Sequence, residues 1–420
     1  MNRQTKTDSK RDHSAHSTPP NRVVIIGGGP VGCWTALQLK RRDPHLEVIV
    51  YEKRERYQRD HMMSVRRASL LDGSARVGDL LDDPLLRDLR AANSSAAHLA
   101  PSGRVRREAL PPVLYINTQT FESILRRHCE ALGVQVRCEE ASSPEALMRA
   151  HPGCQLFIAA DGAHSQMREA LFGPEGVRRE DLLYTVDMKY LAEGQARYMR
   201  APTYSDLDHI IVESVGREVP SPAGGVTQVG SRAMVTEDTF DDVGEATFKD
   251  PISLDQLRAR APELAEDLTR FQALRLLRTG ERAVPGSEVI SRVKLSRYSA
   301  VEFAALLTAP SGAQAAWFLA GDAAMGVPFY RTVNIGLRAA SRLAATVSGA
   351  GGLARKVRAH RLRSRLTRAK EFGLVSFKLS GALFYRDWLR PAARRLGWVG
   401  RLLAAPVSLA ARAFPSARLM

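Results

Sequence analysis

The stretch that decides the fold is VVIIGGGPVGC, residues 23–33. Its first four residues are apolar and β-branched, which indicates a strand buried on both faces. A second apolar run, residues 48–51, ends at Glu52. Between the two runs lie a helical pattern of apolar residues and, before it, three glycines in the spacing GxGxxG: Gly27, Gly29 and Gly32. Strand, glycine turn, helix and strand within about thirty residues predict a βαβ unit of a parallel sheet.

The glycine spacing and the acid after the second strand form the fingerprint of a dinucleotide-binding loop. Gly27 permits a tight turn, Gly29 lets the backbone approach a pyrophosphate, and Gly32 allows the helix to pack closely on the strand. The N-terminus of the helix then faces the phosphates with free N–H groups and a favourable dipole. Glu52 lies 20 residues beyond Gly32 and is placed to accept hydrogen bonds from ribose hydroxyls. This motif alone does not separate NAD from FAD.

Two further motifs lie at the ends of predicted strands later in the chain. DGAHSQMR covers residues 161–168 after one apolar run, and GDAA covers residues 321–324 after another. In this order, GxGxxG, DGxxSxxR and GDAA resemble the three fingerprints of the p-hydroxybenzoate hydroxylase-like (class A) flavoprotein monooxygenases. The resemblance extends over roughly residues 22–345.

This resemblance implies that one FAD is extended across the domain that carries the three motifs. The residues that it nominates are Gly27, Gly29 and Gly32 for the pyrophosphate, Glu52 for the adenosine ribose, Gln119 at a helix start, Asp161 and Gly162 between the flavin and the nicotinamide approach, and Gly321 with Asp322 for the ribityl chain. The chain has no second GxGxxG, so NAD(P)H is expected to dock transiently on the FAD complex. No metal site is expected, because no cluster of histidine and cysteine has ligand spacing.

A closer local likeness lies in residues 52–59, EKRERYQR. They resemble the EKRxxxxR segment of the MICAL flavoprotein monooxygenases, whose acid and later arginines contact FAD. The matching residues are Glu52, Arg54 and Arg59. Guanidinium groups suit this role because they bind phosphate oxygens in a bidentate manner. The alternative is a solvated basic loop without a part in cofactor binding.

The chain departs from the class A pattern after GDAA. Pro328 and Asn334 match, but Phe329, Tyr330 and Arg331 stand where the family carries glycines that leave space over the flavin. Bulky side chains at these positions would narrow the site or touch the substrate. Tyr330 and Arg331 are therefore the candidates for polarising a substrate oxygen. The alternative is that the segment only packs between two domains.

The sequence pattern divides the chain into four parts. A polar, flexible leader is expected at residues 1–21, before the first strand. The α/β, Rossmann-like FAD-binding domain is expected at residues 22–179 and 301–350, and an inserted mixed-sheet substrate domain at residues 180–300, where the pattern changes to strand-like alternation. A basic helical region is expected at residues 353–420.

The charge of the chain is concentrated in that last region. The formal net charge is +16, yet residues 22–352 hold 41 basic and 41 acidic residues, whereas residues 353–420 hold sixteen basic and two acidic ones. A basic helix can pack on the body with its cations solvated, lie on an anionic membrane surface, or dock an acidic carrier protein. Nucleic acid is disfavoured because no motif that reads nucleic acid accompanies the charge.

Composition and motifs together favour an enzyme. A hydrophobic content of 44% and four cysteines without CxxC spacing exclude a disordered chain and a disulfide scaffold and fit a cytoplasmic protein, whose basic end is compatible with peripheral attachment to a membrane. The resemblance implies that NAD(P)H and O₂ are used to hydroxylate or epoxidise a small, apolar or aromatic molecule through a flavin C4a-hydroperoxide. A tailoring step in secondary metabolism would fit this chemistry. The alternatives are a flavin oxidoreductase or dehydrogenase without oxygen insertion, and a non-catalytic flavoprotein-fold interaction module.

Overall fold

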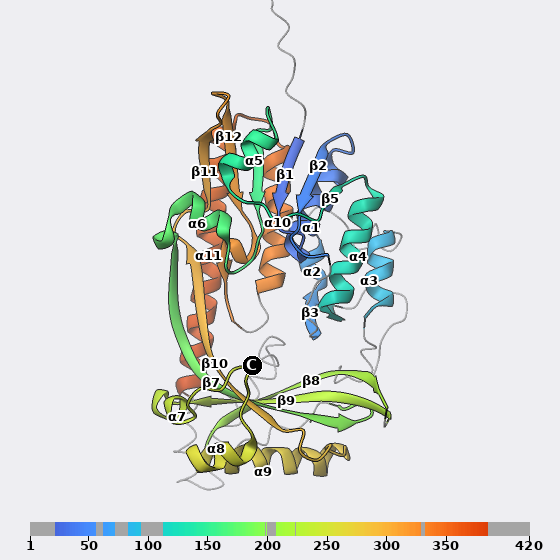
Figure 1. The fold of residues 1–420 in the computed structure, drawn as a ribbon, viewed down its shortest axis with the longest axis vertical. Helices are drawn as coiled ribbons and strands as arrows, with labels where there is room; N and C mark the ends of the chain where they lie inside the picture. The colour runs from blue at the N-terminus through green and yellow to red at the C-terminus, as the bar shows by residue number, and fades with distance from the viewer. Residues whose placement is uncertain are drawn as a thin grey trace, which may run out of the picture.

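The computed structural model describes residues 22–55, 62–71, 83–93, 112–197, 199, 207–222, 224–328 and 332–384. In this part the chain forms two large sheets toward opposite ends of an elongated molecule (Figure 1). Four of the features expected from the sequence lie outside the described residues: the leader at 1–21, Arg59, the segment 329–331 and the end of the chain from 385 to 420.

The first large sheet has the strand order β11-β12-β6-β1-β2-β5. Its strands are β1 (Arg22–Ile26), β2 (Glu47–Tyr51), β5 (Gln135–Arg137), β6 (Leu156–Ala159), β11 (Ala304–Thr308) and β12 (Gln314–Leu319). Five strands are parallel, and β11 closes one edge antiparallel to β12. The Rossmann-like α/β fold predicted from the sequence is confirmed. The order also brings β12, from late in the chain, next to β6 and one strand away from β1.

Alternate residues of β1 enter two separate cores. Val23 and Ile25 belong to the core on one face of the sheet, whereas Val24 and Ile26 belong to the core on the other face. Burial on both faces explains why the strand is a continuous apolar run and not an alternating pattern. The helices that contribute to the first core include α1 (Pro30–Arg42), α4 (Thr118–Ala131) and α10 (Thr332–Ser348).

Shorter elements surround this sheet. They are the antiparallel pair β3 (Met62–Arg66) and β4 (Val113–Asn117), the helices α2 (Arg67–Leu70), α3 (Pro84–Ala91), α5 (Pro144–Ala150) and α6 (Gln166–Phe172), and the 3-10 turns η2 (Pro174–Gly176) and η3 (Gly321–Ala323).

The second large sheet has the order β13-β10-β7-β9-β8, and its described pairings are all antiparallel, a more regular arrangement than the mixed sheet expected. Its strands are β7 (Val177–Glu193), β8 (Ile210–Ser221), β9 (Gly224–Val235), β10 (Val289–Ala300) and β13 (Met325–Gly326). The helices α7 (Glu237–Asp242), α8 (Leu254–Arg260) and α9 (Pro262–Thr279) accompany it. Figure 1 shows α8 and α9 on the side of this sheet that faces away from the parallel sheet. The other side of the sheet is therefore turned toward the parallel sheet.

One long helix, α11 (Leu353–Phe384), runs alongside β7 and β10 from the parallel sheet toward the antiparallel sheet (Figure 1). Val357 and Val375 are buried against the body, and Arg297 of β10 donates to the Phe372 carbonyl at 3.0 Å. The expected helical region is thus a single helix over its first 32 residues. None of the described helices combines the length and the apolar character that a membrane crossing requires.

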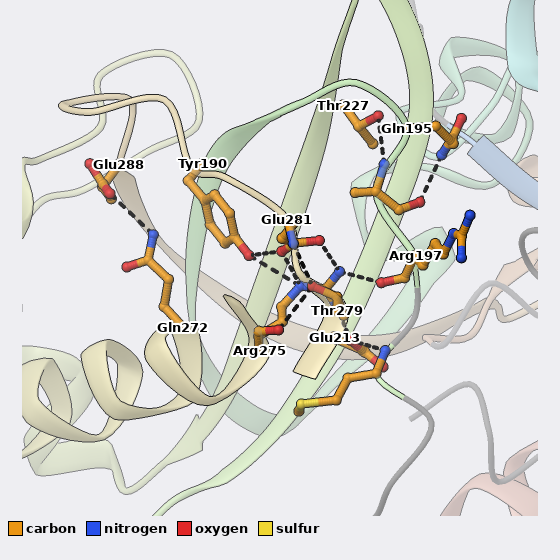
Figure 2. A network of polar contacts seen from close by, with 12 residues as sticks. Tyr190, Gln195, Arg197, Glu213, Thr227, Gln272, Arg275, Thr279, Glu281 and Glu288 are labelled. Atoms are coloured by element: carbon orange, nitrogen blue, oxygen red, sulfur yellow. Dashed lines mark hydrogen bonds and ion pairs between the residues drawn. The ribbon is translucent and has the colours of Figure 1, made fainter. Parts of the chain in front are cut away.

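The antiparallel domain contains a buried ionic network around Arg275 of α9 (Figure 2). The guanidinium is fully buried and forms ion pairs with Glu213 of β8 and with Glu281, whose Oε1 lies 2.8 Å from Arg275 Nε. It also donates to the Tyr190 hydroxyl at 3.1 Å and to the Arg197 carbonyl. One cation therefore holds α9, two strands and the segment after β7 together.

We predict that Arg275→Met destabilises the protein by about 3–5 kcal/mol, because two buried carboxylates would lose their shared cation. Urea unfolding measures this loss directly. Arg270→Met is the matched control. Arg270 lies on the same helix but is half exposed, and its ion pair with Glu266 is long, at 3.9 Å. The control should change stability by less than about 0.5 kcal/mol. Equal stabilities of the two variants would show that the network adds nothing to the fold.

Candidate functional site

The turn between β1 and α1 has the geometry of an anion cradle. Gly27 has φ +100°, and a Cβ there would lie 2.4 Å from the Ala160 carbonyl oxygen, so this position admits only glycine. A Cβ on Gly32 would lie 1.8 Å from the Gly27 carbonyl oxygen, so α1 starts in direct contact with the turn. A Cβ on Gly29, by contrast, would meet no atom of the described residues within 4 Å. The turn thus leaves open space at the one glycine that should face a pyrophosphate.

The start of α1 is free to bind that anion. Gly29 caps the helix without any side-chain hydrogen bond, and the first turn holds no acidic residue. The first backbone N–H groups of a helix have no partner within the helix, and they carry the positive end of its dipole. These features suit a cofactor with two phosphates. The geometry of this loop therefore fits the FAD site that the sequence predicts.

Glu52 lies at the end of β2, directly beside the glycine turn. Its Oε2 accepts a hydrogen bond from the Gly28 N–H at 2.8 Å, and its Oε1 accepts one from the Arg54 N–H at 2.9 Å. Backbone donors therefore hold the carboxylate over the turn, where the ribose of a bound dinucleotide would reach it. The Arg54 side chain is exposed, and Arg59 lies outside the described residues.

The second motif connects the first motif to the third. Asp161 follows β6 and accepts hydrogen bonds from the Ser165 hydroxyl at 2.6 Å and from the Met167 N–H at 3.1 Å. These bonds hold the start of α6, so that the buried Arg168 points back to the parallel sheet. Arg168 Nη1 donates to the Ala323 carbonyl at 3.0 Å, which is part of the third motif. Gly162 has φ +93° and open space beside it, so the backbone of this motif is accessible to a ligand.

The third motif packs on the first. A Cβ on Gly321 would lie 2.9 Å from Val31 Cγ2, and a Cβ on Gly336 of α10 would lie 2.6 Å from the same atom. Asp322, which follows Gly321 and is half-buried, already takes part in polar interactions within the chain. The three motifs therefore meet at the carboxyl ends of β1, β6 and β12, which is where parallel α/β sheets bind their ligands.

Two other expected features lie at the edge of this site. Gln119 is exposed, and its backbone N–H donates to Asn117 Oδ1 at 2.9 Å, so its position follows from the N-cap of α4. Asn334 of α10 is buried, accepts from the Arg66 N–H at 2.7 Å and donates to the Ser64 carbonyl at 2.8 Å. Asn334 thus fastens β3 to the start of α10.

The segment that departs from the family pattern is described only at its two ends. Tyr330 and Arg331, like Phe329, lie outside the described residues. Its two ends are joined, because the Val327 N–H donates to Thr332 Oγ1 at 3.1 Å and Thr332 Oγ1 donates to the Val327 carbonyl at 2.7 Å. Val327 and Thr332 therefore lie side by side, next to β13 and at the start of α10.

One residue near the site was missed by the sequence analysis. Glu122 of α4 is 7% exposed, and its Oε2 has no hydrogen-bond partner among the described residues. Burial, and then the charge of Glu52, raises the pKa of Glu122 to about 8; Arg126 and Arg54 oppose this shift. A signal existed in the sequence, since Glu122 directly follows the buried Phe121 and lies two turns before the buried Cys129, on the inner side of the helix.

Comparisons with known proteins agree with this geometry. The family model described as FAD dependent oxidoreductase (DAO) matches residues 22–73, which contain the glycine turn and Glu52. The solved structure of CtdE in complex with FAD and substrate 4 is similar over 86% of this chain and 89% of that one, with a TM-score of 0.52 at 15% identity. Residues 22–73 of this chain thus match the family of FAD-dependent oxidoreductases, and the chain as a whole has the fold of the class A flavin monooxygenases.

Two further solved structures resemble this chain. OxyS anhydrotetracycline hydroxylase from Streptomyces rimosus has a TM-score of 0.51 at 15% identity, covering 94% of this chain and 74% of the other. The Diels-Alderase PyrE3, from the biosynthetic pathway of pyrroindomycins, has a TM-score of 0.52 at 17% identity, covering 95% of this chain and 79% of the other. No curated protein matches the sequence significantly. At these identities the likeness concerns the fold.

We predict that Gly29→Val and Gly32→Val act on different properties of this flavoprotein. Gly29→Val should leave the melting temperature of the apoprotein unchanged, since its side chain meets no protein atom, but weaken FAD by at least roughly tenfold, or ~1.4 kcal/mol, by filling the pyrophosphate's place. Gly32→Val should destabilise the apoprotein itself by about 1–3 kcal/mol through overpacking. Thermal unfolding and flavin-fluorescence titration measure the two effects. Wild-type FAD affinity in Gly29→Val would contradict the assignment of the cradle.

We also predict that Glu122 makes the apoprotein less stable as the pH rises. The folded protein keeps the Glu122 proton up to about pH 8, whereas the ordinary pKa is 4.5, so the stability due to this proton is complete below pH 4.5 and is lost as the pH rises to about 8. Glu122→Gln should therefore gain stability over the wild type between these pH values, with the largest gain above pH 8. Urea unfolding from pH 5 to about pH 9 measures the difference. Glu130→Gln, an exposed glutamate of the same helix, should show no such trend.

Proposed function

We propose that the protein is a flavin-dependent monooxygenase that uses NAD(P)H and O₂ to hydroxylate or epoxidise a small, apolar or aromatic organic molecule. The observation that carries this proposal is the meeting of the three motifs at the carboxyl ends of β1, β6 and β12, on the side that leads to the antiparallel sheet. OxyS, a hydroxylase by name, has the same overall fold over most of its length. A tailoring step in secondary metabolism is compatible with this chemistry.

Within this proposal each motif holds one part of FAD. Gly27, Gly29 and Gly32 with the start of α1 would bind the pyrophosphate, and Glu52 would bind the adenosine ribose. Asp322, next to Gly321, would bind the ribityl chain. Bound FAD would accept a hydride from NAD(P)H and, once reduced, activate O₂. The further contacts expected from the sequence are those of Arg54, Arg59, Gln119, Asp161 and Gly162. NAD(P)H would bind only transiently.

The protein's own part is positioning and the exclusion of water. Arg168 fixes the Ala323 carbonyl, so the turn that carries Asp322 keeps one shape while ligands enter and leave. Met325 and Val327 are buried beside this turn and form an apolar wall where the cofactor domain continues into the antiparallel sheet. Residues 22–179 and 301–350 would then hold the cofactor, and residues 180–300 the substrate. Tyr330 and Arg331 would polarise an oxygen atom of the substrate from the segment between Val327 and Thr332.

Two measurements test the proposal with the purified, FAD-loaded protein. A panel of small aromatic and apolar compounds is screened for substrate-stimulated oxidation of NADH or NADPH, and products of any hit are analysed after reaction under ¹⁸O₂. We expect one ¹⁸O atom in the product. Stimulated NAD(P)H oxidation without incorporation of ¹⁸O would instead show a dehydrogenase or an oxidase. The Gly29→Val protein is the control for reactions that do not depend on bound flavin.

The candidate substrate residues have a separate test. Tyr330→Phe and Arg331→Ala should keep the FAD content of the wild type but divert NAD(P)H oxidation from product toward hydrogen peroxide. Wild-type coupling in both variants would leave the segment with a packing role only.

A second candidate function deserves a test because the Diels-Alderase PyrE3 has a similar fold. The name of PyrE3 refers to a Diels-Alder reaction, so a similar fold can be associated with a reaction other than oxygen insertion. A chain that binds FAD but oxidises no NAD(P)H with any compound of the panel would support a function of that second kind, or that of an interaction module.

A further inference from the structure

The helix α11 has two different sides. Its inner side is buried against the body through residues that include Val357, His360 and Val375. Its outer side carries large apolar side chains in solvent: Leu362 (60% exposed), Leu366 (62%), Phe377 (77%) and Phe384 (54%). With Leu374, α11 supplies five of the eleven large apolar side chains that are exposed in the described part of the chain. The exposure is therefore concentrated on one element.

The four most exposed of these side chains form one line along the helix. Their spacings of four, eleven and seven residues are close to whole numbers of turns at 3.6 residues per turn. Leu362, Leu366, Phe377 and Phe384 thus form a continuous apolar ridge, about 33 Å long at 1.5 Å per residue. We call these four residues the α11 ridge. A ridge is convex, so it suits insertion into a deformable surface.

The charges of α11 are sorted between the same two sides. Toward the body, Arg361 and Arg365 pair with Glu302, and Glu371 of the helix pairs with Arg338. At 100° per residue, the cations on the ridge or within about a quarter turn of it include Arg355, Arg358, Arg363 and Lys370. None of these four has a carboxylate partner among the described residues. The outer side is therefore apolar in its centre and cationic along its borders.

A small cavity between α10 and α11 adds to this cationic border. Arg342 and Arg363 line it together with the hydroxyl groups of Thr346, Ser364 and Thr367, and Arg363 donates to Thr346 Oγ1. No aspartate or glutamate is among its lining residues. The three hydroxyl groups already form hydrogen bonds within α10 and α11, so the two guanidinium groups are the part of this cavity that suits a phosphate oxygen.

Electrostatics selects among the possible occupants of the ridge. The 36 residues that follow Phe384 carry seven basic and one acidic residue, so they would be repelled by the cations of α11. A second copy of the chain would present the same positive charge. An anionic bilayer complements both features at once, because its phosphates attract arginine and lysine while its acyl region accepts leucine and phenylalanine.

We propose that α11 is an interfacial helix that docks the protein on an anionic lipid surface through its apolar ridge. The helix lies in the plane of the membrane surface and keeps its inner side on the body. This proposal is independent of the reaction at the flavin, because it depends on the outer side of α11 alone.

The test is co-sedimentation of the full-length, FAD-loaded protein with vesicles. Binding to vesicles of phosphatidylcholine with phosphatidylglycerol is expected, and it should fall sharply with pure phosphatidylcholine or at high salt. The variant L362S/L366S/F377S should lose binding by about tenfold or more, because three inserted side chains are removed. Its control is L132S/L277S, which changes two exposed leucines, one directly after α4 and one on α9, and should bind like the wild type. Equal FAD content and melting temperature show that both variants are folded.

A third variant separates the cations from the ridge. R358Q/R363Q should weaken binding to anionic vesicles and reduce its dependence on salt. Unchanged binding by the ridge variant would overturn the proposal, since the residues after Phe384 would then suffice for attachment. Binding to an acidic polypeptide such as polyglutamate, without binding to anionic vesicles, would also overturn it and would indicate a protein partner.

Discussion

The structure depends on the close contact of α1 with the ends of three parallel strands. Val31, at the start of that helix, lies against Gly321 after β12 and Gly336 on α10, and neither position has room for a Cβ. Gly32 lies against the Gly27 carbonyl with still less space. These contacts bring the first and third motifs together, and Arg168 adds the second motif through the Ala323 carbonyl. A methyl group at any of these glycines would separate the segments that the cofactor must bridge.

The parts of the fold that are encoded locally could be predicted from the sequence. The βαβ unit, the strand runs before Asp161 and Gly321, and the change of pattern in the middle of the chain are each read within a few residues. The bond from Arg168 to Ala323 joins residues 155 positions apart, and no local pattern indicates it. The same holds for Asn334, whose side chain fastens β3 across 270 positions. Contacts of this kind follow from the sheet order, which the sequence does not display.

The candidate site shows the same division. The glycines and Glu52 could be nominated from the sequence because one turn and one helix determine their spacing. Glu122 was missed, although its place on the inner side of α4 can be read from the helical period, because no motif contains it. The helix α11 was expected as part of a basic helical region, but the sequence did not show which side of it faces the body, since apolar residues on both sides, such as Val375 and Phe377, hide the amphipathic pattern. The structure distinguishes the two sides, because the rest of the protein covers one of them and leaves the other exposed.

The strand order has a consequence for the synthesis of the protein. The parallel sheet is complete only after β12, and the antiparallel domain, except its short edge strand β13, is translated between β6 and β12. At roughly 5–20 residues per second, the ribosome needs about 8–30 s for this interval. During that time β6 has no neighbour on one edge, and the third wall of the cofactor site does not yet exist. The inserted domain can fold as a unit in this interval, whereas the nascent cofactor domain must wait with an open edge of the kind that chaperones protect.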